Sequence, residues 1–426
     1  MRALHALLAA TLAVAVVVVP VGGATSPAPG GSAGSVAPPV SGDAPGTAPL
    51  AQIGVPQTGE ARSLNGTVDV LAPADGVPNR STTTRVVLDI GPAVSVATNA
   101  SNHALLTRRA VTRVREADDV DAALARELDR LKARTDALGR SQRAALRAFV
   151  AGEADARTTL LRLVRIDRAA RALDDRRRSV VAAARARGAN VPTERSAALD
   201  RELALYTGAV RARVAASLTG DAPPTRVYVS ATRRGVTLAT LTESGYVRET
   251  YRGGLRRTDG DPLDRQTARQ VVAEAYPTVW AARRAVDAQS AQVARVRVTY
   301  TGGELAATVG AGNQRVFRDV HRQSFGVAGT NQVAINTRDG LQLVVNRSYP
   351  GGPMRVRVRT VDGESVDASI TVGPEGGDST PVGTTGPDGE FWTLTPSERF
   401  TIVAIRDQSV VFLTMDPLET PRAGRR

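Results

Sequence analysis

The sequence has no cysteine, only 3 histidines and few aromatic residues, with 2 Trp, 7 Tyr and 6 Phe in 426 residues. The absence of cysteine excludes disulfide bonds, thiol chemistry and attachment through a lipid-modified cysteine. Beyond the first 24 residues the histidines are His103 and His321, which are too few for a histidine-rich zinc site. Neither a phosphate-binding loop nor a dinucleotide-binding glycine pattern occurs. We therefore expect no metal site, no cofactor and no thiol-dependent activity.

The chain has abundant arginine instead. Lys132 is the one lysine among 55 lysine and arginine residues, and the formal net charge is +13. Residues 101–221 carry +9 and residues 222–334 carry +7, whereas residues 335–426 carry −2. Hydrophobic residues make up 42% of the chain, which is enough to form buried cores. The composition predicts folded domains whose first and middle parts have a basic surface.

The first 24 residues have the layout of a secretory signal peptide. A charged start precedes the apolar run Ala6–Val19, and small residues at positions 22–24 predict cleavage after Ala24. An uncleaved anchor is the alternative, although the run is shorter than the roughly 20 residues that span a membrane. Residues 25–60 are rich in Pro, Gly, Ser and Thr and are expected to form a disordered linker. Glycosylation sequons, which would be used only after export, lie at Asn65, Asn79, Asn99 and Asn346.

Residues 61–100 read as a short β or irregular segment. Arg85–Val96 resembles a strand, and Gly91-Pro92 interrupts it. From residue 101 to 221 apolar residues recur every 3.5 residues on average, for example at Leu163, Ile166, Leu173 and Val180. This spacing predicts a helical bundle or antiparallel coiled coil of four or five helices. Breaks are expected at Gly139, at Gly152 and at residues 188–192.

Residues 222–334 change to a two-residue period. Three short strands from residue 226, a helix capped by Asp264 and a final hairpin predict a small α+β domain. Residues 335–417 show only strand patterns and predict a β-sandwich, and residues 418–426 form a basic tail. The expected fold class is multidomain α+β, with an N-terminal helical bundle, a middle α+β domain and a C-terminal β-sandwich.

Two resemblances accompany these patterns. DASITVG (Asp367–Gly373), VGTTGPDGEFWTL (Val382–Leu394) and ERFTIVAI (Glu398–Ile405) resemble carboxypeptidase-regulatory-like, or prealbumin-like, domains. That resemblance implies a seven-stranded accessory sandwich without catalytic residues. The order of the segments, with Thr98-Asn99-Ala100-Ser101-Asn102 opening the helical region, also resembles uncharacterised secreted proteins of haloarchaea. The basic net charge departs from the acidic character of most halophile proteins.

Arginine is densest in the second half of the helical region. Arg176, Arg178 and Arg185 are predicted to face outward, while Arg177 falls on the apolar seam and should pair with an acid on a neighbouring helix. A solvated helix face and a binding face for a polyanion are both consistent with this pattern. The region's aromatic residues, Phe149 and Tyr206, lie near the apolar seams, which favours an acidic glycan over specific nucleic-acid binding.

Two groups of polar residues could carry chemistry. Asp319, His321 and Ser324 are the residue types of a hydrolase triad, but a triad requires a spatial arrangement and an oxyanion hole. Asp259, Asp261 and Asp264 have calcium-like spacing, yet Gln270 stands where an EF-hand has glutamate. We expect neither group to be catalytic or metal-binding.

The predicted function is a secreted or cell-surface, non-enzymatic protein of the cell envelope. Its partners would be an envelope protein or an acidic glycan. A binding module for acidic polymers, using Arg176, Arg178 and Arg185, is the alternative, and a hydrolase that uses His321 is the third hypothesis. No transmembrane segment is expected once the signal peptide is removed.

Overall fold

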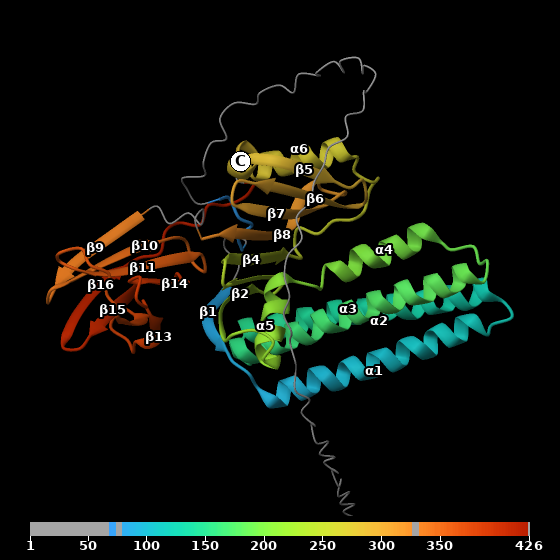
Figure 1. Ribbon diagram of the computed structural model, residues 1–426. Helices are drawn as coiled ribbons and strands as arrows, with labels where there is room; N and C mark the ends of the chain where they lie inside the picture. The colour runs from blue at the N-terminus through green and yellow to red at the C-terminus, as the bar shows by residue number, and fades with distance from the viewer. Residues whose placement is uncertain (1–67, 74–78, 326–331, 425–426) are drawn as a thin grey trace, which may run out of the picture. The chain divides into compact units, whose positions relative to one another are not determined.

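The computed structural model describes residues 68–73, 79–325 and 332–424 (Figure 1). These residues form a helical region, an eight-stranded sheet with two further helices, and two four-stranded sheets. The predicted fold class, multidomain α+β with a C-terminal β-sandwich, is confirmed. The signal peptide, the linker and the site at Asn65 lie outside the described residues.

Five helices make up the helical region. They are α1 (Ile90–Arg115), α2 (Val120–Val150), α3 (Ala156–Ala186), α4 (Thr193–Ala204) and α5 (Ala209–Thr219). Asp119 and Asp155 cap α2 and α3, because each carboxylate accepts a hydrogen bond from an N–H of the first turn, at 2.8 and 2.7 Å. Figure 1 shows α1, α2 and α3 running alongside one another. The predicted seam is confirmed, since its residues Leu163, Ile166, Leu173 and Val180 are all buried.

The expected break at Gly139 is wrong. Gly139 lies inside α2, and a Cβ at this position would come within 2.6 Å of the Tyr206 hydroxyl. The glycine thus provides space for a neighbouring side chain and does not end the helix. The expected break at Gly152 is right, because its φ of 80° is a left-handed conformation that suits glycine at a helix end.

The eight-stranded sheet has the order β1-β2-β3-β4-β8-β7-β6-β5, and every pair that it forms is antiparallel. Its strands are β1 (Asn79–Val86), β2 (Thr225–Thr232), β3 (Gly235–Leu241), β4 (Gly245–Arg252), β5 (Arg283–Ala288), β6 (Val293–Tyr300), β7 (Gly303–Gly310) and β8 (Arg315–Ser324). The helices share one apolar core with β1, β2 and β3, which includes Val86, Val227 and Leu238. The expected division at residue 222 therefore separates two segments that fold around a common core.

The prediction of a strand at residues 85–96 is wrong. The strand β1 ends at Val86, and helix α1 begins at Ile90 with Asp89 as its cap. Gly91 and Pro92 fall in the first turn of α1, where backbone N–H groups have no partner within the helix. Proline is tolerated there, so Pro92 marks the start of a helix and not the interruption of a strand.

Two short helices, α6 (Arg265–Ala275) and α7 (Pro277–Ala281), pack on the other face of the sheet. Leu238, which faces the helical region, aligns across the sheet with Ala306 of β7. The neighbours of Ala306 in β7, Leu305 and Ala307, point to the opposite face and belong to the core that contains α6. Asp264 caps α6 as predicted, accepting hydrogen bonds from Gln266 and Thr267. These contacts fix the sheet between helices on both faces.

The C-terminal part is a β-sandwich of two sheets, ordered β14-β11-β10-β9 and β13-β12-β15-β16. Its strands are β9 (Gln332–Arg338), β10 (Leu341–Arg347), β11 (Pro353–Thr360), β12 (Ser369–Pro374), β13 (Thr380–Thr384), β14 (Glu390–Leu394), β15 (Phe400–Arg406) and β16 (Ser409–Met415). Val345, Met354, Ile370 and Phe400 lie in the core between the sheets. The resemblance implied seven strands, and the structure has eight in these two sheets.

Candidate functional site

The basic face predicted on α3 is only partly exposed. Arg178 is 63% exposed and Arg185 is also exposed, as expected. Arg176 is 3% exposed, which corrects the prediction that it faces outward. The reason is that α3 contacts α1, α2, α4 and α5. The buried arc of α3 is therefore wider than the single seam from which the outward position was inferred.

The neighbours of Arg176 in the sequence are already paired. Arg177 lies 3.2 Å from Asp200 on α4 and 2.7 Å from Asp174, so its predicted partner on a neighbouring helix is confirmed. Arg178 lies 3.4 Å from Asp174 and 2.5 Å from Asp175. A guanidinium that is already neutralised by local acids has little charge to offer a ligand. The densest arginine run is therefore not the strongest candidate for binding.

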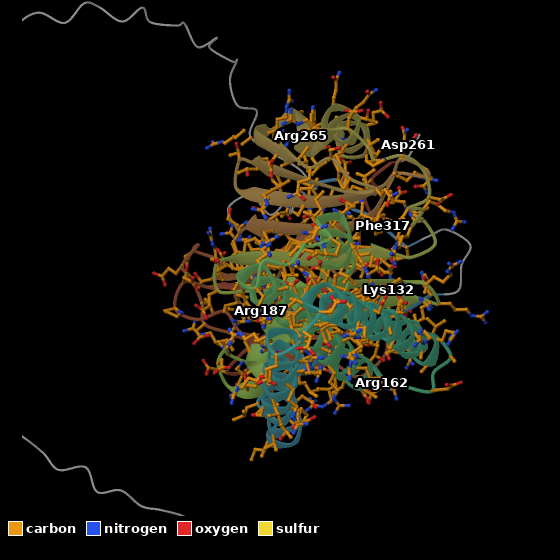
Figure 2. All side chains as sticks on the ribbon, turned by 90° about the vertical axis from the view of Figure 1, so that its right-hand side faces the viewer. Lys132, Arg162, Arg187, Asp261, Arg265 and Phe317 are labelled. Carbon is orange, nitrogen blue, oxygen red and sulfur yellow. The ribbon has the colours of Figure 1, made fainter. Side chains whose placement is uncertain are left out.

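A better set of cations occupies the first half of α3. Arg162, Arg165 and Arg168 are exposed, and none of them has an ion pair within the described part of the chain. We call these three residues the α3 basic stripe. Figure 2 shows nitrogen-tipped side chains projecting from the helical region, where Arg162 is labelled. The sequence analysis missed the stripe because it looked for the highest density of arginine. The signal that identifies the stripe is that its arginines are three residues apart and that no Asp or Glu lies three or four positions from any of them.

Two residues of the α3 basic stripe, Arg165 and Arg168, line a groove between α1 and α3. The groove has a volume of about 700 Å³. Asn99, His103 and Thr107 line it from α1, and Arg165, Arg168 and Arg171 line it from α3. Alanine residues of both helices, Val96 of α1 and the acidic Asp175 of α3 complete the lining, and the small alanine side chains leave the groove open. The arrangement offers a concave surface with guanidinium groups along one side.

One arginine of the groove is held by a buried acid. Nε and Nη2 of Arg171 donate to the two carboxylate oxygens of Asp167, at 2.9 and 3.1 Å. Asp167 is fully buried and also accepts a hydrogen bond from the N–H of Gly208 at 2.8 Å. The hydrogen bond from Arg171 to Asp167 raises the pKa of Arg171. Arg171 therefore has a structural partner, whereas Arg165 and Arg168 have no ion pair with any residue that the structure describes.

Family models match three consecutive parts of the chain. A domain of unknown function (DUF7096) matches residues 1–223, which is more than half of the chain. The chain belongs to the DUF7096 family. A second family of unknown function (DUF7094) matches residues 227–327, and an archaeal fibronectin-III type-like domain matches residues 332–413. Neither a curated protein nor a solved structure matches this chain.

The matches agree with the observed folds. The DUF7096 match includes the whole helical region and β1, and the third match coincides with the β-sandwich. The predicted sandwich is thus confirmed, and its match is to the fibronectin-III type.

The residues suggested for a hydrolase are not arranged as a triad in this DUF7096 chain. Nε2 of His321 lies 3.2 Å from Oδ2 of Asp319, and both residues are fully buried. Ser324 follows an odd number of positions after His321, so it lies on the opposite face of β8, where its hydroxyl donates to the carbonyl of Gly302. Ser324 is therefore not placed to act as a nucleophile with this pair, and both members of the pair are buried.

Asp319 instead anchors an N-terminal segment. Its Oδ2 accepts hydrogen bonds from the N–H of Leu71 at 2.8 Å and from the hydroxyl of Tyr276 at 3.1 Å. Nη1 of Arg248 donates to the carbonyl of Leu71 at 2.9 Å. Burial acts to raise the pKa of Asp319, but the hydrogen bond and charge of His321 and the charge of Arg248 hold it below its usual range. This cluster is a buried clamp on residues 68–72.

The predicted glycosylation sites among the described residues differ in their exposure. Asn79 and Asn99 are exposed, so both could carry a glycan, while Asn346 is half-buried and accepts a hydrogen bond from Arg357 at 3.4 Å.

The described residues contain no group of three or more His, Asp or Glu side chains that could hold a metal ion. Among those residues no helix is long and apolar enough to cross a membrane.

Proposed function

We propose that this protein is a secreted or cell-surface, non-enzymatic interaction protein that binds an acidic polymer along the α3 basic stripe. One observation carries the proposal. Arg162, Arg165 and Arg168 are exposed at three-residue spacing and have no ion pair among the described residues, and Arg165 and Arg168 line the α1–α3 groove. The rise of about 1.5 Å per residue places these side chains about 4.5 Å apart along the helix axis. Such a row suits an extended chain of anions.

The physical advantage of an unpaired row lies in counterion release. An exposed arginine with no partner contributes little to folding, and it gains its favourable interaction when a polyanion replaces the surrounding salt ions. Binding of this kind weakens as the salt concentration rises. The stripe is therefore expected to have a salt-dependent affinity for acidic polymers.

A glycan-like polymer suits this surface better than nucleic acid. Proteins that bind single-stranded nucleic acid usually stack bases on exposed aromatic rings. In the helical region the aromatic side chains are Phe149 and Tyr206, which are 0% and 4% exposed. The apolar run Ala6–Val19 and the exposed sequons at Asn79 and Asn99 support an extracellular location. The intact mass of the native protein tests this location. A mass that corresponds to a chain beginning near Thr25 would support export, and a mass that includes residues 1–24 would favour a membrane anchor.

The test compares two triple variants on immobilised alginate at several salt concentrations. The first is Arg162→Gln/Arg165→Gln/Arg168→Gln, and the matched control is Arg140→Gln/Arg143→Gln/Arg147→Gln on α2. The control residues are also exposed and have no ion pair among the described residues, so both variants lose the same charge. The first variant should lose about one unit of salt slope for each lost contact, and the control should keep the slope of the unchanged protein. Equal slopes in both variants would contradict a localised binding face.

A further inference from the structure

Arg176 is a buried cation without an adequate partner. The side chain is 3% exposed, and its Nη2 is buried without any hydrogen bond to the described residues. Its best contact is a long one, 3.5 Å from Nε to the hydroxyl oxygen of Thr107 on α1. A buried guanidinium normally has a carboxylate or several carbonyl groups around it. The contacts of Arg176 within the protein therefore do not account for its position.

The surroundings of Arg176 add positive charge. Burial, followed by the neighbouring charge of Arg134, lowers the pKa of Arg176, and the charge of Arg113 acts in the same direction. Glu127 is the acid that opposes them, but its carboxylate is already bound by Arg113 at 3.1 Å and Arg130 at 3.0 Å. The interface of α1, α2 and α3 thus has an excess of cations.

A second unpaired nitrogen atom belongs to His103, whose pKa the charge of Arg176 affects. Nδ1 of His103 is buried and has no hydrogen bond to the described residues. Burial and the charges of Arg176 and Arg134 lower the pKa of His103, so the ring is neutral near pH 7 and can carry its one N–H on Nδ1. His103 and Thr107 both line the α1–α3 groove. Arg176 does not line the groove itself, but its Nε lies 3.5 Å from the hydroxyl oxygen of the groove residue Thr107. One unpaired nitrogen atom therefore belongs to a residue of the groove, and the other belongs to a side chain directly behind it.

We propose that Arg176 and His103 bind one compact oxyanion, a carboxylate, sulfate or phosphate group, at the interface of α1, α2 and α3. A guanidinium presents planar, forked N–H donors that match two oxygen atoms of an oxyanion. The bound charge would offset the excess of cations and would satisfy both unpaired nitrogen atoms. The site does not depend on the α3 basic stripe, because none of its groups belongs to Arg162, Arg165 or Arg168. The anion is either a free ion or an acidic group of a longer molecule in the groove.

The test is the melting temperature in sodium sulfate against sodium chloride at the same ionic strength. The unchanged protein should melt higher in sulfate by on the order of 2 °C, because a ligand that binds only the folded state stabilises it. Arg176→Met should lose this rise, while the matched control Arg178→Met, an exposed residue on the same helix, should keep it. An equal rise in both variants would overturn the proposal, since it would reflect a general effect of sulfate.

Two additions keep the result interpretable. If Arg176→Met does not fold, His103→Ala should reduce the rise in sulfate, and an unchanged rise would overturn the proposal. Alginate distinguishes the sources of the anion when it is added to Arg162→Gln/Arg165→Gln/Arg168→Gln, which lacks the stripe proposed to bind it. A rise with alginate alone in that variant, lost when Arg176→Met is added, identifies an acidic group of a polymer. No rise with either compound would show that water, and not an anion, completes the site. The variant Arg162→Gln/Arg165→Gln/Arg168→Gln should keep its response to sulfate, so failure of the stripe and failure of this site are distinguishable.

Discussion

Two arginines of the helical region are equally buried but differ in their partners. Arg211 on α5 and Arg176 on α3 are each 3% exposed. Nε of Arg211 donates to Glu249 of β4 at 3.1 Å, and its Nη1 donates to Gln142 and to the carbonyl of Tyr206. Glu249 also accepts the N–H of Val210 at 3.1 Å. Among the residues that the structure describes, Arg176 has a single hydrogen bond, the long contact with Thr107.

The difference distinguishes a structural ion pair from an open binding site. Arg211 and Glu249 connect the helices to the sheet, and each satisfies the other's charge. Arg176 has donors left over and cations nearby, so its burial is costly unless something from outside the chain binds there. Burial of a charge alone does not indicate its role, whereas a count of its partners does.

The largest expected effect comes from placing a new charge in the core of α3. Leu173 is 2% exposed and packs in the seam one turn before Arg176. Leu173→Asp removes an apolar side chain and buries a carboxylate without a partner, so the free energy of unfolding should fall by about 4 kcal/mol. Thermal or urea unfolding measures this change. An unchanged stability would mean that this face of α3 is not packed.

The next effect comes from breaking the structural pair. Arg211→Met leaves Glu249 buried without its cation, and unfolding free energy should fall by about 3–5 kcal/mol. The double variant Arg211→Met/Glu249→Met should recover part of that loss, because it removes both charges of the pair, while Arg318 loses the favourable charge of Glu249. If the single variant is as stable as the unchanged protein, the pair does not connect the helices to the sheet.

In a buffer without oxyanions, Arg176→Met should raise the free energy of unfolding, whereas Leu173→Asp and Arg211→Met lower it. Removing a buried cation that lacks a partner should raise the unfolding free energy by about 1 kcal/mol. Chemical unfolding in a chloride buffer measures this shift. A loss of several kcal/mol, as expected for Arg211→Met, would place Arg176 among the structural ion pairs and remove the contrast between the two arginines.

The smallest effect is expected at the surface. Arg178 is 63% exposed, and its partners Asp174 and Asp175 belong to the same helix. Arg178→Gln should change the unfolding free energy by less than about 0.5 kcal/mol, since exposed ion pairs contribute little. The same unfolding measurement checks this expectation. A decrease in the free energy of unfolding of more than about 2 kcal/mol would show that the exposure of a side chain on α3 does not indicate its contribution to stability.

The sequence predicted much of the local structure because local structure depends on neighbouring residues. The seam through Leu163 and Leu173, the cap at Asp264 and most strands of the sandwich follow from periodicity and turn residues within a few positions. The pairing of Arg177 also followed, because a charged residue on an apolar seam must find an acid on the adjoining helix. For the candidate site the sequence located α3 and its arginines, but it selected Arg176, Arg178 and Arg185 in place of the α3 basic stripe.

The sequence by itself determined the periods of the helices and strands, the positive charge of α3 and the absence of thiol chemistry. Only the tertiary structure decided which arginines are buried, because burial depends on how many helices surround α3 and not on its own pattern. It also decided that residues 79–86 join a sheet whose next strand begins at Thr225, and that Asp319 binds the N–H of Leu71. These contacts link residues more than a hundred positions apart, and no local preference of the chain specifies them.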